Sequence, residues 1–327
     1  MVILQDLKLY LENDLKALDQ KILEYFQNRE ALIKIIGDYI VNSGGKKIRS
    51  IFSLLAFKML SDVEPDDKII NSCAAIELIH MATLLHDDVV DGSKTRRSLP
   101  SANVVWGVNA SILVGDFLLS QAFNFLVSVK SLKVLDVLAK TSSLIIEGEV
   151  VQLSQLKKKK IFSQEEYFHI IDLKTAKLFS AAFEVSSILS FQENYSDKLK
   201  QYGLLVGRIF QITDDVMDYG FGLTSLGKSP GGDFQEGKVT LPVIILHNFL
   251  TLEDKSKLEV MFQYTERNDE EFQWIKQQMI NLKINEHIKK ILAQLERESQ
   301  SLLKSLNIRN QNFSYVQQLT NFIVNRI

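Results

Sequence analysis

The chain has 327 residues, of which 46% are hydrophobic and 24% charged, and its formal net charge is −2. This near-neutral balance does not indicate a nucleic-acid binder, and the hydrophobic content suffices for one large core or two modest ones. The single cysteine, Cys73, rules out an internal disulfide, so we expect a reducing, cytoplasmic location and interpret Cys73 as a small buried apolar residue. Neither a signal peptide nor a membrane span is expected.

Apolar residues recur at helical spacing along most of the chain, which contains only four prolines. The pattern predicts helices, in chain order, over residues 6–41 (one long or two short helices), 47–61, 67–91, 103–129, 132–156, 164–189, 195–219 and 239–250, with amphipathic helices thereafter. Ser163 and Glu166 fit a capping box at the start of the sixth of these segments. No segment shows sustained strand-like alternation. We therefore predict an all-α fold, a single domain over residues 1–327 with ten or more helices.

Two clusters of aspartates end two of the apolar predicted helices. The clusters share one spacing and consist of Asp87, Asp88 and Asp91, and of Asp214, Asp215 and Asp218. Two carboxylates about 4 Å apart repel by roughly 4 kcal/mol at an effective dielectric near 20, so a cation is expected beside each cluster. Oxygen ligands without His or Cys favour Mg²⁺, which typically binds one or two carboxylates together with phosphate oxygens. The clusters therefore predict a phosphorylated substrate bound through metal.

Basic residues stand close in sequence to these clusters or to glycine turns. Glycine-rich helix starts favour anions through backbone N–H groups, arginine offers bidentate binding to phosphate, and lysine offers a mobile point charge. Together they predict a clamp for diphosphate groups, formed by Lys46, Arg49, Arg96, Arg97, Lys174, Lys228 and Lys238.

In this combination of motifs the chain resembles the trans-polyprenyl diphosphate synthases, and most of all their long-chain octaprenyl, solanesyl and decaprenyl members. The resemblance runs from about Gly44 to Pro242 and more weakly to Arg326. It rests on both aspartate motifs, His80, Arg96 and Arg97, and on the segments GGKKIR (44–49), GDFL (115–118), GEVVQL (148–153), KT (174–175), FQITDDVMD (210–218), LGK (226–228) and EGKVTLP (236–242).

The sequence departs from the family pattern at two positions. Ser98 stands where glycine usually follows the paired arginines, and Gly232 stands where many long-chain members carry a second acid before Asp233. Neither departure removes an expected ligand. Both bear on loop geometry and turnover rate.

The resemblance implies an isoprenoid-synthase fold, a helical bundle around a central active-site cavity, that forms a homodimer. It implies that isopentenyl diphosphate is condensed head to tail with an allylic diphosphate: the allylic substrate ionises, the double bond of isopentenyl diphosphate attacks, and a proton is lost. The six aspartates would bind Mg²⁺, about three ions per active site. Isopentenyl diphosphate would be bound by Lys46, Arg49, His80 and Arg97, and the allylic diphosphate by Arg96, Lys174, Thr175, Gln211, Lys228, Lys238 and Asp233.

Product length is expected to depend on the helix before Asp87. Ala82 and Thr83 stand one turn before this residue, where aromatic side chains in the family block elongation. Both are small, and Ala75 lies two turns deeper. Because one turn rises about 5.4 Å, close to the length of one isoprene unit, we predict a long product of about C30 to C50. Phe117 and Phe123 are candidates for a deeper floor, with core packing as the alternative.

Other interpretations remain open from the sequence. The chain can be a short-chain farnesyl or geranylgeranyl diphosphate synthase, a terpene cyclase, or a non-catalytic subunit of a heteromeric synthase. Glu77 with His80, and Glu166 with His169, have the Glu-x-x-His spacing of di-iron bundles. Glu149 and Gln152 can be polar residues satisfied within a bundle. The lysine run 157–160 is interpreted as a solvated helix exit, with peripheral membrane contact during product release as an alternative.

Overall fold

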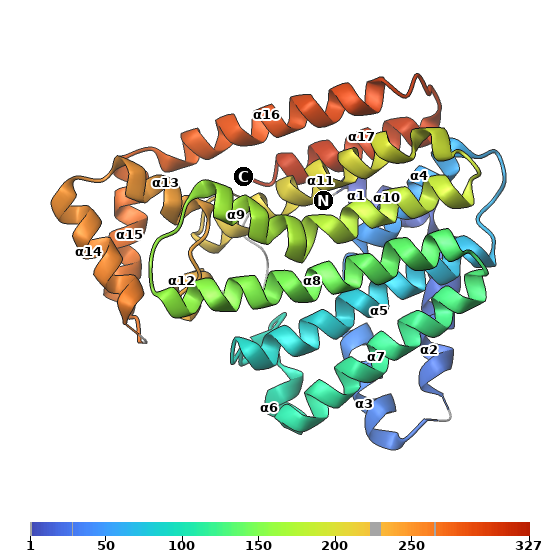
Figure 1. The fold of residues 1–327 in the computed structure, drawn as a ribbon, viewed down its shortest axis with the longest axis horizontal. Coiled ribbons are helices and arrows are strands. Elements are labelled where there is room, and N and C mark those ends of the chain that lie inside the picture. The colour runs from blue at the N-terminus through green and yellow to red at the C-terminus, as the bar shows by residue number, and fades with distance from the viewer. Residues whose placement is uncertain (1, 28, 223–229, 265) are drawn as a thin grey trace. The chain divides into compact units, whose positions relative to one another are not determined.

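The computed structural model describes residues 2–27, 29–222, 230–264 and 266–327, which are almost entirely helical (Figure 1). The helices are α1 Val2–Tyr10, α2 Glu12–Phe26, α3 Ala31–Asn42, α4 Ile48–Leu60, α5 Asp67–Val90, α6 Ala102–Trp106, α7 Val108–Val129, α8 Leu132–Lys158, α9 Gln164–Ile171, α10 Lys177–Leu189, α11 Ser196–Asp218, α12 Gly232–Glu236, α13 Leu241–Phe249, α14 Leu252–Gln263, α15 Asp269–Asn281, α16 Ile284–Lys304 and α17 Gln311–Val324. A π-helical turn, η1 Asp172–Ala176, joins α9 to α10, and a 3₁₀ turn, η2 Glu193–Tyr195, precedes α11. The all-α prediction is confirmed.

The chain divides into two compact units. Unit 1 comprises Met1–Ser142, Ser180–Lys200 and Leu306–Leu319, and unit 2 comprises Ser143–Phe179, Gln201–Ser305 and Thr320–Ile327. Helices α8, α10, α11 and α17 each contribute residues to both. The single domain with a central cavity stays a prediction.

Helix α5 forms the centre of unit 1 and carries the first aspartate cluster at its end. It begins at the cap residue Asp66, whose side chain accepts from the backbone N–H of Lys68 and of Ile69. Buried residues follow along the helix, which contacts α2, α4 and α7. Helix α7 runs beside α5 (Figure 1), and a Cβ at its Gly115 would lie 2.3 Å from Nε2 of His86. Glycine at this position therefore permits the close approach beside the cluster.

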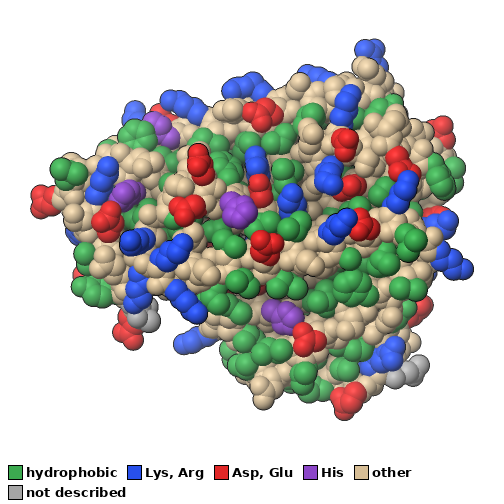
Figure 2. Space-filling view, viewed as in Figure 1, with side chains coloured by type: hydrophobic (Ala, Val, Ile, Leu, Met, Phe, Trp, Pro, Cys, Tyr) green, Lys and Arg blue, Asp and Glu red, His purple; other side chains and the backbone are tan. Residues whose placement is uncertain are grey.

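Helices α5 and α7 are also long and apolar enough to cross a membrane, by length and composition alone. In α5, 72% of the most apolar stretch is buried inside the protein, which is typical of a core helix, whereas in α7 the share is 44%. Hydrophobic side chains accordingly gather on the surface over α7 (Figure 2), where Val108, Ile112, Leu113, Phe123 and Val127 are exposed. The absence of a membrane span stays a prediction.

Three of the predicted helices are interrupted. Residues 6–41 form parts of three helices instead of one or two. The chain turns at Leu11, between α1 and α2. The second break follows α2, where Gln27 is extended, with ψ of 142°, and Glu30 then caps α3. Residues 103–129 break at Gly107, whose φ is +88°. Residues 164–189 contain the π-helical turn.

The π-helical turn of unit 2 is packed closely between two helices. A Cβ at Gly148 of α8 would lie 2.9 Å from the backbone nitrogen of Lys174, and a Cβ at Gly207 of α11 would lie 2.4 Å from Cα of Ala176. Two glycines thus let neighbouring helices approach the backbone of this turn, which carries the KT motif. Single π-helical turns are frequent at functional sites.

The capping box at the start of α9 is confirmed. The side chain of Ser163 accepts from the backbone N–H of Glu166, and Glu166 accepts from the backbone N–H of Ser163. This gives Glu166 a structural role at a helix end, so the second Glu-x-x-His pair needs no metal to explain it.

Candidate active site

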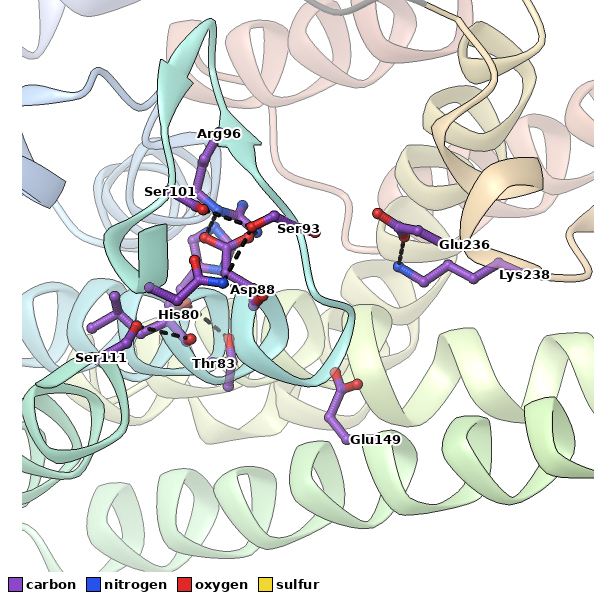
Figure 3. A network of polar contacts seen from close by, with 12 residues as sticks. His80, Thr83, Asp88, Ser93, Arg96, Ser101, Ser111, Glu149, Glu236 and Lys238 are labelled. Carbon is purple, nitrogen blue, oxygen red and sulfur yellow. Dashed lines mark hydrogen bonds and ion pairs between the residues drawn. The ribbon is translucent and has the colours of Figure 1, made fainter. Parts of the chain in front are cut away.

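The first aspartate cluster contains two kinds of carboxylate. Asp88 is only 2% exposed, whereas Asp87 and Asp91 are half-buried. Arg96 binds both oxygens of Asp88: Nε donates to Oδ2 and Nη2 donates to Oδ1, each at 2.6 Å (Figure 3). Asn103 adds a hydrogen bond from Nδ2 to the backbone carbonyl of Asp88, at 3.0 Å. Protein donors therefore engage the whole carboxylate of Asp88.

A short hairpin after α5 places the paired arginines. Its strands are β1 Thr95–Arg96 and β2 Leu99–Pro100, paired antiparallel. The two residues at the turn have positive φ, +96° at Arg97 and +65° at Ser98, as expected for a tight hairpin turn. The family glycine is thus replaced at a left-handed position, which costs an L-residue on the order of 1 kcal/mol. Nη1 of Arg97 donates to the backbone carbonyl of Gly44, so the turn and the glycine-rich loop meet.

His80 lies among three guanidinium groups of unit 1. Burial lowers the pKa of His80 well below its ordinary value, and Arg49, Arg97 and Arg96 lower it further. This direction of the shift favours the neutral imidazole in the ligand-free protein. The structure thus brings together three of the four residues expected to bind isopentenyl diphosphate. The fourth, Lys46, is exposed on the glycine-rich loop.

This lowered pKa predicts an acid-sensitive stability. Below about pH 6.5 the unfolded chain protonates His80 while the folded chain does not, so stability falls as pH drops. We expect the melting temperature of the ligand-free protein to fall more steeply between about pH 7 and pH 5 than that of His80→Gln, which cannot titrate. Thermal melts of both proteins across this range measure the difference. Parallel curves would contradict the assignment of a neutral histidine.

The second aspartate cluster, on α11 in unit 2, also contains one buried carboxylate and two that are more exposed. Asp215 is 4% exposed; Tyr167 Oη donates to its Oδ2 at 2.6 Å, and Gln211 Nε2 donates to its Oδ1 at 2.8 Å. Thr175 Oγ1 donates in turn to Gln211 Oε1 at 2.7 Å. Burial raises the pKa of Asp215 to about 7, against the opposing hydrogen bonds from Tyr167 and Gln211. The central aspartate is therefore a buried acceptor for protein groups, as Asp88 is in unit 1.

Helix α12 brings a fourth carboxylate to this cluster. The backbone N–H of Asp233 donates to Oδ2 of Asp218 at 2.9 Å, and burial, followed by the charge of Asp218, raises the pKa of Asp233. A Cβ at Gly232 would lie 3.4 Å from Oδ1 of Asp218. The acid that many long-chain members carry there would add another negative charge beside Asp218, and glycine avoids it.

The remaining predicted residues of unit 2 line a pocket of about 100 Å³. Lys174 Nζ donates to Glu149 Oε2 at 2.7 Å, and Lys238 Nζ lies 2.5 Å from Glu236 Oε2 (Figure 3). Residues lining the pocket include Tyr167, Lys174, Thr175, Gln211, Asp215, Asp233 and Lys238. Six of these seven were predicted from the sequence. Lys228 lies outside the described residues.

The residues expected to set product length lie along α5 and α7. Ala75 and Ala82 are buried, and Thr83 donates from Oγ1 to the His80 carbonyl at 2.8 Å (Figure 3). Phe117 is half-buried, and the guanidinium of Arg29 lies 5.9 Å from its ring centroid. Phe123 reaches the surface. The two alanines thus occupy positions where a larger side chain would displace buried neighbours.

Sequence reasoning missed or undervalued three residues. Tyr167 was not singled out, although it holds Asp215. Glu149 was interpreted as a polar residue of the bundle, although it pairs with Lys174. Arg326 served only to mark the extent of the resemblance, although its Nη2 lies 2.6 Å from Asp214 Oδ1. Of the three, only Tyr167 had a local signal in the sequence, namely its position seven residues before the KT motif. The pairings of Glu149 with Lys174 and of Arg326 with Asp214 join distant segments.

The donor set fits a hard divalent cation. Within the described part of the chain, no three His, Cys, Asp or Glu side chains are arranged to hold a metal ion unaided. The members of the clusters with greater exposure, Asp87, Asp91, Asp214 and Asp218, offer only carboxylate oxygens. Mg²⁺ typically takes one or two carboxylates and completes its shell with phosphate oxygens and water. These four carboxylates allow that kind of coordination.

Comparisons with known proteins agree with this chemistry. The model of the polyprenyl synthetase family matches residues 30–279. Octaprenyl diphosphate synthase of Escherichia coli (strain K12) is 42% identical over 232 residues, which are 71% of this chain and 71% of that protein. A crystal structure of polyprenyl synthase from Caulobacter crescentus CB15, complexed with calcium and isoprenyl diphosphate, has a TM-score of 0.90 at 32% identity and covers 99% of this chain and 98% of that one. The crystal structure of a decaprenyl diphosphate synthase from Rhodobacter capsulatus has a TM-score of 0.91 at 30% identity, covering 99% of both chains.

Proposed function

The chain belongs to the polyprenyl synthetase family, and we propose that it condenses isopentenyl diphosphate with an allylic diphosphate to make a long-chain all-trans polyprenyl diphosphate. The observation that carries this proposal is the shared construction of the two aspartate clusters. In each, protein donors hold the central aspartate, and less buried aspartates flank it on the same helix. The relatives named octaprenyl and decaprenyl diphosphate synthase support the long product.

We assign the metal to the flanking carboxylates: Asp87 and Asp91 in unit 1, Asp214 and Asp218 in unit 2. Mg²⁺, when bound, neutralises the allylic diphosphate and so makes it a better leaving group. The calcium and isoprenyl diphosphate bound in the Caulobacter relative support a divalent cation acting with a prenyl diphosphate. About three ions per active site, together with the seven basic side chains predicted above, would balance two diphosphates and the six aspartates.

The side chains of the protein contribute binding, orientation and charge. Arg96, fixed by Asp88, and Lys174, beside Glu149, hold the allylic diphosphate as negative charge develops on it. Lys238 adds a positive charge from the loop after α12. We assign Thr175 and Gln211, which are hydrogen bonded to each other and through Gln211 to Asp215, to the neighbourhood of the reacting carbons. Most of the rate enhancement arises from positioning and electrostatic stabilisation, without a protein nucleophile.

Isopentenyl diphosphate is assigned to the basic cluster of unit 1. Arg49 and Arg97 supply fixed charges, Lys46 supplies a mobile one, and neutral His80 supplies a hydrogen bond. The double bond of this substrate attacks the allylic cation, and the released diphosphate is the base that accepts the final proton.

The experiment is an assay of the purified chain alone with Mg²⁺, labelled isopentenyl diphosphate and several allylic primers. We expect linear prenyl diphosphates, loss of activity with a chelator, and recovery with added Mg²⁺. Inactivity of the pure chain would favour the non-catalytic subunit, cyclic products would favour a cyclase, and stoichiometric iron would favour the di-iron bundle.

The exposed apolar side chains of α7 support a homodimer. Val108, Ile112, Leu113 and Val127 lie on its surface, and a second copy of this chain would cover them. Light scattering after size exclusion measures the assembly. We place the enzyme in the cytoplasm, with peripheral membrane contact as the route for releasing a long apolar product.

A further inference from the structure

Arg326 contacts helix α11 of unit 2 through its guanidinium group. It is 8% exposed. Nη2 lies 2.6 Å from Oδ1 of Asp214 in an ion pair, and the guanidinium carbon lies 5.4 Å from the ring centroid of Phe210, one turn earlier on α11. An ion pair and a cation–π contact therefore bind one side chain to the segment that presents the second cluster.

Close packing holds the main chain at Arg326 beside α11. Gly222 has φ of +89°, and a Cβ there would lie 2.5 Å from the carbonyl oxygen of Arg326 and 2.6 Å from Cα of Ile327. Nearer the start of α11, the hydroxyls of Tyr202 and Thr320 are hydrogen bonded at 2.6 Å and buried. The segment from Thr320 onward is thus held at both ends by other residues of unit 2, independently of the ion pair.

The close contact between Arg326 and Asp214 joins Nη2 to Oδ1. Arginine and a carboxylate commonly pair through two parallel hydrogen bonds, as Arg96 and Asp88 do. Here Nη1 of Arg326 is buried and has no hydrogen-bond partner among the described residues. The side chain of Asp214 is 38% exposed. The ion pair therefore holds Oδ1, while the side chain as a whole keeps part of its surface open to a ligand.

We propose that Arg326 is a positioning residue for the second aspartate cluster. By holding Oδ1 of Asp214, it presents Oδ2 to the divalent cation that accompanies the diphosphate, and its charge offsets the repulsion within the cluster. Carboxylates that bind metals depend on hydrogen bonds of this kind for orientation. The inference rests on the proposed function, because it requires that Asp214 bind a metal.

The test is Mn²⁺ binding in the presence of inorganic diphosphate, measured from the electron paramagnetic resonance signal of free Mn²⁺. We expect Arg326→Met to weaken binding about tenfold and Arg326→Lys, which keeps the charge, to weaken it less. The control is Arg309→Met, an equal substitution at an exposed position before α17, which should match the wild type. Unchanged or tighter binding by Arg326→Met would overturn the proposal, since tighter binding would make Arg326 a competitor of the metal.

A double-mutant cycle separates positioning from a general effect on folding. If Arg326 acts through Asp214, adding Arg326→Met to Asp214→Asn weakens Mn²⁺ binding no further than Asp214→Asn alone. Additive losses would overturn the proposal. Failure of the wild-type protein to bind Mn²⁺ with diphosphate would instead contradict the proposed function itself. Arg326→Lys supplies the same comparison should the methionine variant melt below the assay temperature.

Discussion

Asp87→Asn and Asp91→Asn should each lower kcat by about 10²- to 10³-fold while leaving the melting temperature of the ligand-free protein unchanged or raised. Each substitution removes a carboxylate assigned to metal, and it also removes repulsion from neighbouring carboxylates. Steady-state kinetics at several Mg²⁺ concentrations, with a thermal melt of each variant, measure both effects. Activity lost together with stability would contradict the assignment.

Asp88→Asn is the matched control, because it changes an adjacent carboxylate of the same cluster. Both oxygens of Asp88 accept hydrogen bonds from Arg96, and an asparagine would leave one guanidinium donor without an acceptor. We expect a loss of about 1–3 kcal/mol in the free energy of unfolding, visible without metal or substrate. Equal stability in the Asp87 and Asp88 variants would show that the cluster is not divided in this way.

Ala82→Phe should shorten the main product sharply, because a ring one turn before Asp87 would obstruct the path of the growing chain. Ala82 is 2% exposed, so the larger side chain must displace buried neighbours, and overpacking commonly costs 1–3 kcal/mol. The product distribution by reversed-phase chromatography does not depend on total activity and therefore stays informative in a less stable variant.

Val63→Phe provides the control for this substitution. Val63 is an exposed residue after α4, so the same ring is added away from α5 and the product length should not change. A wild-type distribution from Ala82→Phe would show that this part of α5 does not line the path.

The helices that carry chemistry could be predicted because their signals are local. The buried run before Asp87 and the repeated aspartate spacing locate α5, α11 and both clusters without tertiary information. The same spacing gave no means of separating Asp88 from Asp87, because the burial of Asp88 and its contacts with Arg96 and Asn103 depend on segments that follow α5. Within each cluster, the aspartates differ in the protein groups that contact them, and the sequence pattern does not reveal this difference.

Other features depend on contacts that sequence periodicity does not encode. The π-helical turn at the KT motif lies where Gly148 and Gly207 bring neighbouring backbones close, and either glycine alone suggests only a weak helix position. Ser98 shows no preference for positive φ, so the tight turn was not expected there. The pairing of Arg326 with Asp214 joins residues more than a hundred positions apart.

Product length is the most direct test of the central claim. The purified chain is incubated with Mg²⁺, an allylic primer and excess labelled isopentenyl diphosphate, and the dephosphorylated products are compared with polyprenol standards. The small side chains of Ala75, Ala82 and Thr83 predict a main product of about C30 to C50. A main product of C15 under these conditions would contradict the long-chain assignment.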